Sequence, residues 1–229
     1  MNTKVVLFSA GIDSLATILK LPDAKILYFR AGFSHTDKDL MAIKKIAVLL
    51  KRKVVIEDSL NLGKFETNDF GPIFCRNLLF ATIAANYGNE IYMGAIRGDN
   101  ALDKNPKAFS DMSKVLTDLG GKKILVKSLL WNKTKSEIVK EILTYPNGKK
   151  LLLASISCYA STVKHCGRCG SCFRRWVGMM NNNIKEEYEN DPFKWDQVPV
   201  YIKKMKKGMY DSKRKKETFI ALKKAGLEL

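Results

Sequence analysis

The sequence lacks a long apolar segment. Its uninterrupted hydrophobic runs stay below about ten residues, whereas a membrane-spanning helix needs about twenty. The N-terminal part is also poor in apolar residues, because only Val5 to Phe8 precede the small and polar residues at 9–14, too few for the apolar core of a secretory signal. We therefore expect a protein that makes no membrane contact and stays in the cytoplasm.

Acidic residues are scarce relative to basic ones. The 229 residues include 40 Lys and Arg but 23 Asp and Glu, which gives a formal net charge of +17. Such a field attracts the phosphates of a nucleotide, a nucleic acid or an anionic surface, and the charge alone does not choose among them. With 46% hydrophobic residues, the chain can still bury the core of one ordinary domain.

Two common nucleotide-binding motifs are missing, because the chain has neither the Gly-Lys-Ser/Thr of a Walker A loop nor a G-x-G-x-x-G sequence. Instead, the small residues Ser9-Ala10-Gly11-Ile12-Asp13-Ser14 follow an apolar run and precede a helical pattern. A loop of this kind directs free backbone N–H groups and a helix N-terminus toward one point, which suits a phosphate. A capped helix without a ligand is the alternative.

Apolar runs alternate with amphipathic segments along the first two thirds of the chain. Strands are expected at residues 4–8, 25–29, 53–56, 91–94 and 124–126. Helices are expected at residues 15–21, 40–50, 77–87 and 110–119 and from Lys135, after the capping box Thr134-x-x-Glu137. This order predicts a doubly wound α/β fold with a mainly parallel sheet, helices on both faces, and ligands at the carboxyl ends of the strands.

Four of the five cysteines lie close together, at Cys158, Cys166, Cys169 and Cys172. Four soft ligands at this spacing favour a tetrahedral Zn²⁺ site in a reducing compartment, and four filled positions would make its role structural. An iron–sulfur cluster and free buried thiols are the alternatives. We expect the neighbouring His165 in an exposed loop. Cys75 stands apart and is expected in the core.

From about Phe193 the composition turns to lysine and aromatic residues, with lysine clusters at 203–207 and 213–216. We therefore predict a domain over residues 1–185, including the cysteine cluster at 158–172, and a basic helical extension over residues 186–229. Tyr201, Met205 and Tyr210 between the lysines suggest a helix lying over a nucleic-acid or protein partner. A solvated helix that only raises solubility is the alternative, and the sequence leaves a homodimer open.

The loop at residues 9–14 resembles the S-G-G-x-D-S loop of the ATP pyrophosphatases, with Ala10 at the position of the family's first glycine. The resemblance implies the PP-loop fold of the adenine-nucleotide alpha-hydrolase type and cleavage of ATP to AMP and pyrophosphate. It also implies that the loop binds the pyrophosphate portion of ATP together with Mg²⁺, with Asp13 in a catalytic role. The residues implied in ATP binding are Ser9, Ala10, Gly11, Asp13 and Ser14.

Taken with the cysteines, the loop points to a narrower family. The segment from Ser157 through the cysteines to Arg174 resembles the 7-cyano-7-deazaguanine synthases of queuosine biosynthesis, and the likeness covers about residues 4–175. Further matching pieces are Pro72 with Arg76-Asn77, Gly94 with Asp99, and residues 133–138. The chain departs from the family at residues 100–106 and after the second expected strand, where only His35 matches.

The resemblance implies ATP-dependent conversion of 7-carboxy-7-deazaguanine and ammonia to 7-cyano-7-deazaguanine, through adenylated intermediates and an amide. Arg76 would hold the substrate carboxylate or the phosphates in a catalytic role, and Asn77 and Asp99 would bind the deazapurine edge. The alternatives are a surface helix start for Arg76 and a loop turn for Asp99. Lys133 and Lys135 could reach phosphates, but lysines beside a capping box are usually solvated, so we expect both in solvent. A related enzyme that stops at the amide or transfers the activated deazaguanine to another amine is one alternative. A zinc-containing nucleic-acid-binding module is another.

Overall fold

A computed structural model of the chain describes residues 2–67, 73–99 and 102–227. Pro72, Asn100 and the residue after Asn100 belong to the segments singled out above and lie outside the described residues. Within the described part, every helix is too short or too polar to cross a membrane.

The centre of the fold is a parallel sheet of five strands in the order β3-β2-β1-β4-β5, which confirms the predicted α/β class. The strands are β1 (Lys4–Leu7), β2 (Lys25–Phe29), β3 (Val54–Glu57), β4 (Glu90–Met93) and β5 (Leu125–Lys127). Val6 of β1 pairs with Ile26 on one side and Tyr92 on the other. The strand order reverses between β1 and β4, so the loops after these two strands flank the crevice where such sheets bind ligands.

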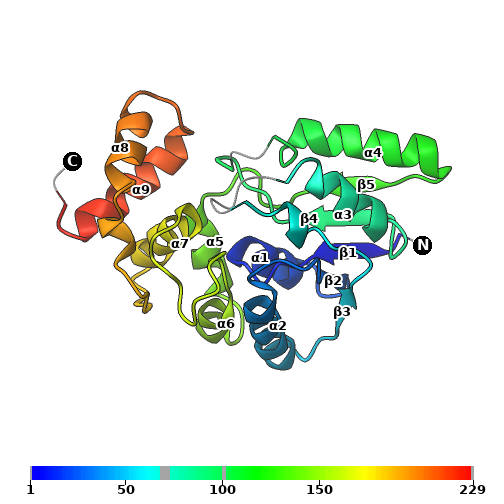
Figure 1. Cartoon of the computed structure of the whole chain (residues 1–229), viewed down its shortest axis with the longest axis horizontal. Coiled ribbons are helices and arrows are strands. Elements are labelled where there is room, and N and C mark those ends of the chain that lie inside the picture. Colours follow the sequence, from blue (N-terminus) through cyan, green and yellow to red (C-terminus); the bar gives the residue numbers. More distant parts are fainter. Residues whose placement is uncertain (1, 68–72, 100–101, 228–229) are drawn as a thin grey trace.

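Helices cover both faces of the sheet, as Figure 1 shows. The first face carries α1 (Ile12–Lys20), α2 (Thr36–Leu50), α5 (Lys135–Ile142) and α6 (Gly148–Ala154), and the second carries α3 (Arg76–Ala84) and α4 (Pro106–Gly120). Because side chains alternate along a strand, Val6 packs in the core under the first set and Val5 under the second. Helix α4 begins earlier than predicted because Asn105 caps it and accepts a bond from Ala108 N at 3.0 Å.

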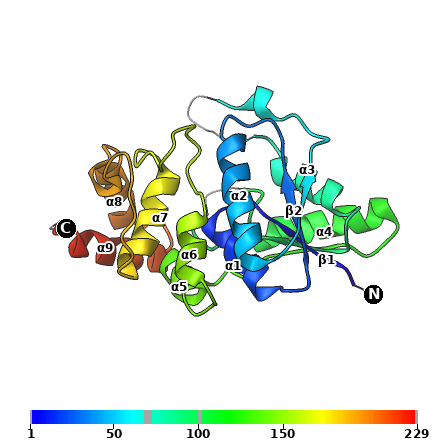
Figure 2. The same ribbon diagram turned by 90° about the horizontal axis from the view of Figure 1, so that it is seen from below.

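The C-terminal part consists of helices beside the sheet (Figure 2). Its elements are α7 (Gly170–Asn181), the short 3-10 turn η2 (Pro192–Lys194), α8 (Val198–Lys206) and α9 (Ser212–Lys224). A second 3-10 turn, η1 (Gly63–Phe65), follows β3. Phe173 and Trp176 of α7 pack with Leu222 of α9 in a third core. Met205 is buried and Tyr201 packs against Phe173, so both residues contact the chain itself. The basic extension is helical, as predicted, and the domain boundary at residue 185 stays a prediction.

Candidate functional site

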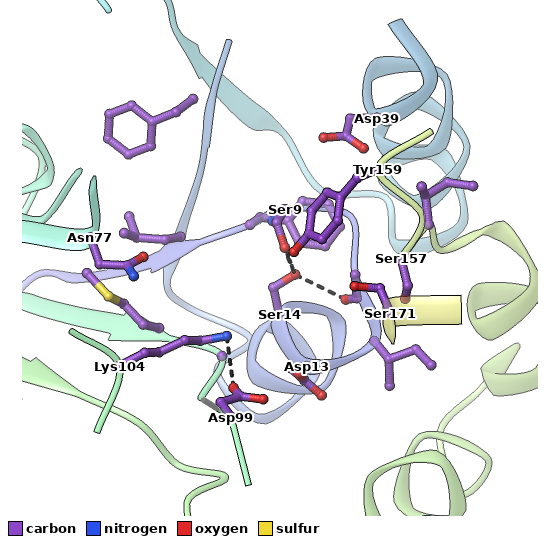
Figure 3. A pocket seen from close by; sticks show the side chains of 18 of the residues that line it. Ser9, Asp13, Ser14, Asp39, Asn77, Asp99, Lys104, Ser157, Tyr159 and Ser171 are labelled. Carbon is purple, nitrogen blue, oxygen red and sulfur yellow. Dashed lines mark hydrogen bonds and ion pairs between the residues drawn. The ribbon is translucent and has the colours of Figure 1, made fainter. Parts of the chain in front are cut away.

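A cavity of about 400 Å³ lies at the carboxyl ends of β1, β2 and β4. It brings together most of the site residues predicted from the sequence (Figure 3). The predicted residues that line it are Ser9, Gly11, Asp13, Ser14, Arg76, Asn77 and Asp99. Ala10 does not line the cavity. Its side chain is fully buried, and its carbonyl oxygen accepts a bond from Ile156 N at 2.9 Å.

The loop after β1 is held by its own hydroxyl groups. Ser14 Oγ accepts from Ser9 N at 3.1 Å and donates to Gly11 O at 3.1 Å, and the two serine Oγ atoms lie 3.2 Å apart. The φ of Ala10 is +56°, in the left-handed region that favours glycine, which explains why a glycine is usual here in the loop it resembles. The result is a small-residue turn that leads directly into the N-terminus of α1.

Gly94 brings the end of β4 against this loop. A Cβ atom at residue 94 would lie 2.8 Å from Asp13 C and from Ser14 N, so only glycine permits the approach. The contact places the loop after β4, which carries Asp99, next to the first turn of α1. The spacing of Gly94 and Asp99 in the sequence thus reflects a shared wall of one pocket.

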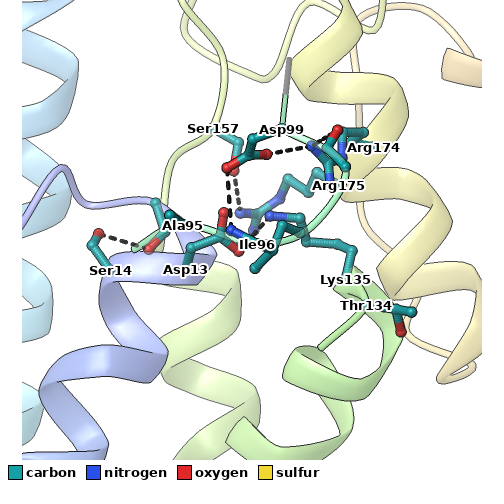
Figure 4. Close-up of polar contacts among 12 residues, drawn as sticks. Asp13, Ser14, Ala95, Ile96, Asp99, Thr134, Lys135, Ser157, Arg174 and Arg175 are labelled. Atoms are coloured by element: carbon teal, nitrogen blue, oxygen red, sulfur yellow. Dashed lines mark hydrogen bonds and ion pairs between the residues drawn. The ribbon is translucent and has the colours of Figure 1, made fainter. Parts of the chain in front are cut away.

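The position of Lys135 differs from the one predicted from the sequence. Its side chain is 10% exposed, and its Nζ lies 2.5 Å from Asp13 Oδ1 inside the pocket (Figure 4). Burial lowers the pKa of Lys135, and Asp13 opposes that change. The expectation of a solvated lysine was wrong because α5 packs on α1, which turns its first residue toward Asp13. Lys133 is 35% exposed and pairs with Glu141 instead.

Asp99 lies between two cations. Its carboxylate is 3.1 Å from Lys104 Nζ and 2.5 Å from Arg174 Nη1. Burial acts against ionisation, but Lys104, Arg174 and Lys135 outweigh it and lower the pKa of Asp99 below its usual range. Although burial acts in the opposite direction, Asp99 raises the pKa of Lys104. This side of the pocket therefore holds three cations (Lys104, Lys135 and Arg174) and two carboxylates (Asp13 and Asp99) in one connected group, which we call the charged side.

Arg174 has a donor to spare. Its Nε is buried and has no hydrogen-bond partner among the described residues, while Nη1 donates to Gly98 O at 3.2 Å. A buried guanidinium N–H without an acceptor is costly unless a ligand supplies one. An anion in the pocket would do so.

One wall of the pocket is aromatic. Phe80 stacks on Phe29 with ring centroids 4.3 Å apart, and Arg76 lies over the ring of Phe33 at 5.8 Å. Asn77 is fixed by Asp103, which accepts from the Asn77 side chain at 2.9 Å and from its backbone at 3.2 Å. This wall suits a flat heterocycle, with Arg76 and Asn77 at its edge.

A buried polar pair lies beyond the aromatic wall. His35 Nε2 is 3.7 Å from Asp39, which accepts from Tyr28 OH at 3.4 Å. Burial raises the pKa of Asp39 to about 7 and lowers that of His35. The ring of Tyr159 meets His35 edge-on, so the segment after Cys158 closes this end of the pocket.

The four clustered cysteines converge as predicted, with their sulfur atoms all within 4.8 Å of one another. Cys166 Sγ and Cys172 Sγ are 3.9 Å apart, and the backbone N–H groups of residues 166, 168 and 172 point at sulfur atoms at 3.4 Å. N–H groups aimed at sulfur stabilise thiolates, the form that binds a metal. This is the one group of metal-ligating side chains found among residues 2–67, 73–99 and 102–227.

The predictions for His165 and for the isolated Cys75 were wrong. His165 is 5% exposed instead of lying in an open loop, because its Nε2 accepts from Ser157 N at 3.2 Å and its ring packs against Tyr188. Cys75 is exposed instead of buried, because it precedes α3 with a φ of +49° on the outside of the fold.

Arg175 ties the cysteine cluster to the sheet domain. Its guanidinium is buried and donates to Glu186 through Nε and Nη2, both at 2.7 Å. The same group donates to Leu152 O at 2.6 Å and Ser155 Oγ at 2.8 Å, in the segment that leads from α6 to Cys158. The bonds to Leu152 and Ser155 thus fix α7 against the end of α6, and the ion pair with Glu186 neutralises the buried charge.

The family model described as queuosine biosynthesis protein QueC matches residues 24–183, more than half of the chain. The chain belongs to the QueC family. Two archaeal relatives are named 7-cyano-7-deazaguanine synthase. The one from Thermoplasma acidophilum is 28% identical over 93% of this chain and 98% of its own length, and the one from Picrophilus torridus is 29% identical over 89% and 95%.

A third relative of the same name, from Saccharolobus solfataricus, is 27% identical over 82% of this chain, which spans about half the length of that protein (47%). Among solved structures, the chain is similar to the U34-tRNA thiolase NcsA from Methanococcus maripaludis with its [4Fe-4S] cluster. That alignment covers all of this chain and 74% of the thiolase, with 10% identity and a TM-score of 0.36. So low a score does not bear on the function or the metal.

Sequence reasoning missed three cations of the pocket: Lys104, Lys135 and Arg174. A signal existed for two of them, because Lys135 lies in the segment that matched the family and Arg174 follows the last cysteine by two residues. Lys104 lies in the segment that departs from the family pattern, and no pattern marked it.

Proposed function

We propose that the chain is a 7-cyano-7-deazaguanine synthase that uses ATP to turn 7-carboxy-7-deazaguanine and ammonia into the nitrile, releasing AMP and pyrophosphate. Membership of the QueC family supports this proposal, as do the names of the relatives. The observation that carries it is the charged group at the crevice between β1 and β4, where Lys104, Lys135 and Arg174 meet the small-residue loop. Such a group fits a polyphosphate next to an aromatic slot.

In this proposal the loop and the cations both bind the phosphates of ATP. The backbone of Ser9 to Ser14 and the N-terminus of α1 accept the pyrophosphate portion, and Lys135 and Arg174 balance the charge that develops as it leaves. Asp13 offers the kind of oxygen ligand that Mg²⁺ prefers, and Mg²⁺ when bound would neutralise part of the pyrophosphate charge.

The aromatic wall would hold the deazapurine. Arg76 at its edge is placed to pair with the carboxylate, and Asn77 is held ready to bond the heterocycle. Removing both oxygens of the carboxylate requires each of them to be converted into a leaving group, so two adenylations are implied. The enzyme's contribution is to position the two substrates and to screen charge.

We further propose that the cysteine cluster holds one structural Zn²⁺. A tetrahedral site with Zn–S bonds of about 2.3 Å has sulfur atoms about 3.8 Å apart, and the pair at 3.9 Å fits that edge. A cluster of several iron atoms would hold its thiolates farther apart, because the irons and sulfides lie between them. With four thiolates present, no position stays open for a reactant.

The experiment is to measure products from ATP, Mg²⁺, ammonium and 7-carboxy-7-deazaguanine by mass spectrometry. Two AMP per nitrile supports the synthase, one AMP per amide supports an enzyme that stops halfway, and an adduct formed only with an added amine supports a transferase. Asp13→Ala should abolish AMP formation and leave the zinc content unchanged. Formation of ADP, or no hydrolysis with any carboxylated deazapurine, would refute the proposal and favour the nucleic-acid-binding alternative.

A further inference from the structure

Helix α9 lies beyond the segment that the QueC family model matches, yet it reaches the pocket side of the fold. Most of its charged residues are exposed lysines, but Arg214 and Glu217 are 8% and 7% exposed. Long charged side chains are rarely buried to this extent without a partner. The partners of both adjoin the charged side of the pocket.

Glu217 caps the helix that carries Lys135. Its Oε2 accepts from Ser136 N at 2.8 Å and from Ser136 Oγ at 2.7 Å, and its Oε1 lies 3.4 Å from Lys135 N. These N–H groups belong to the first turn of α5, where an anion is favoured by the helix dipole and by donors that lack a partner within the helix. The carboxylate therefore fixes the backbone of the residue whose side chain pairs with Asp13.

Arg214 contacts the turn that Arg174 also contacts. Its Nη1 donates to Gly98 O at 2.5 Å, the same carbonyl that Arg174 contacts at 3.2 Å. Gly98 precedes Asp99 and has a φ of +115°, a conformation that glycine permits. Arg214 and Arg174 both hold the carbonyl of this turn. Arg214 is held in turn over the ring of Tyr210, at 4.4 Å from the ring centroid.

We propose that Glu217 and Arg214 are positioning residues for the ATP phosphates: Glu217 places Lys135, and Arg214 places the turn that carries Asp99 opposite Arg174. The C-terminal helix is thereby part of the catalytic unit, although neither residue contacts the cavity itself. The proposal rests on the proposed function in taking this pocket as the ATP site. A misplacement of about 1 Å in such a group costs about 10²-fold in rate.

The test is Glu217→Ala and Arg214→Ala in the full-length protein, with Lys216→Ala as the matched control. Lys216 is on the same helix, between the two residues, and its side chain is exposed. The readouts are kcat for AMP formation, KM for ATP, KM for the deazapurine, and the affinity for Mg·ATP by calorimetry. Assays are run well below the melting temperature of each variant, with the folded fraction measured by circular dichroism.

We expect Glu217→Ala to lower kcat for AMP formation by about tenfold or more, with KM for the deazapurine within about twofold of wild type, since the aromatic wall is untouched. Glu217→Gln, which keeps an acceptor oxygen for Ser136, should recover part of the loss, and Lys216→Ala should behave as wild type. A lower melting temperature with kcat and both KM values within about twofold of wild type would overturn the proposal.

The two proposals can fail separately. If the wild-type protein forms AMP and the two α9 variants do so equally well, the positioning role fails and the synthase stands. If the wild type forms no AMP with any carboxylated deazapurine, the synthase proposal fails, and calorimetry with Mg·ATP decides the role of α9. Weaker binding of Mg·ATP by the variants than by Lys216→Ala would then support it, and equal binding would overturn it.

Discussion

Replacing Lys135 by methionine removes one positive charge from the pocket and keeps nearly the same side-chain length. Lys135 Nζ lies 2.5 Å from Asp13 Oδ1, and the two side chains are 10% and 16% exposed. At an effective dielectric constant of about 20, this distance gives an attraction of about 7 kcal/mol, before the cost of taking both charges out of water is subtracted. The contact places both charged groups together at the N-terminus of α1.

The expected effect is on the rate. If Lys135 balances charge on the departing pyrophosphate, Lys135→Met should lower kcat for AMP formation by about 10²–10³-fold, the loss seen when one preorganised donor to a developing charge is removed. The assay follows labelled ATP to AMP at saturating ATP. Zinc content should not change, because the cysteine cluster is built from residues 158–172.

Lys133→Met is the matched control. Lys133 is the same kind of residue on the other side of the cap Thr134, but it is 35% exposed and pairs with Glu141, which Lys20 also contacts. A partly exposed pair of this kind contributes about 1 kcal/mol or less, so stability and AMP formation should stay near wild type. Equal rates for Lys135→Met and Lys133→Met would refute the reasoning, because burial beside Asp13 would then have no catalytic consequence.

Three further outcomes follow from the buried groups. Burial raises the pKa of Asp39 to about 7, so the contribution of Asp39 to stability is complete below about pH 4 and is lost as the pH rises to 7. In urea titrations, the difference in unfolding free energy between wild type and Asp39→Asn should fall by about 1.4 kcal/mol per pH unit in this window. A difference that stays constant with pH would contradict this prediction. Glu186→Gln leaves the buried Arg175 without a charged partner and should lower the unfolding free energy by about 3–5 kcal/mol in the same assay. The double variant Arg175→Met with Glu186→Gln should lose less, because no unpaired charge stays buried. A decrease below about 1 kcal/mol for Glu186→Gln would show that the pair is not needed. Cys169→Ser should remove the metal and lower the melting temperature, as elemental analysis and calorimetry would show; wild-type protein without zinc would disprove the assignment.

The parts of the fold that the sequence predicted are those with local, periodic signals. Strand β4 is buried throughout and its run of apolar residues ends at Gly94, so the strand and its end were both visible. The capping box at Thr134 marked the start of α5, and the structure confirms both of its hydrogen bonds. The cysteine cluster was equally clear, because four ligands close in sequence need no long-range packing to be recognised.

What the sequence did not reveal depends on packing between distant elements. Lys135 and Asp13 are 122 residues apart, and their contact exists because α5 lies on α1. The helical pattern around the capping box does not distinguish Lys135 from Lys133, since both are lysines next to the same cap, and only the resemblance to the family marked the segment of Lys135. His165 was likewise misjudged, because Ser157 and Tyr188, which bury it, come from other segments.

The cysteine cluster and the pocket share a wall. Ser157, Cys158 and Tyr159 line the cavity, as does Ser171 next to Cys172, so the segments that the metal would hold are also surfaces that ligands would touch. If the cluster holds the proposed Zn²⁺, loss of the metal would also disturb the pocket. In a preparation in which only some molecules hold zinc, each metal-free molecule should be inactive. Specific activity should then rise linearly from zero with the number of zinc ions per chain. The yield of active enzyme from a cell would then be set by its zinc supply as much as by expression of the chain.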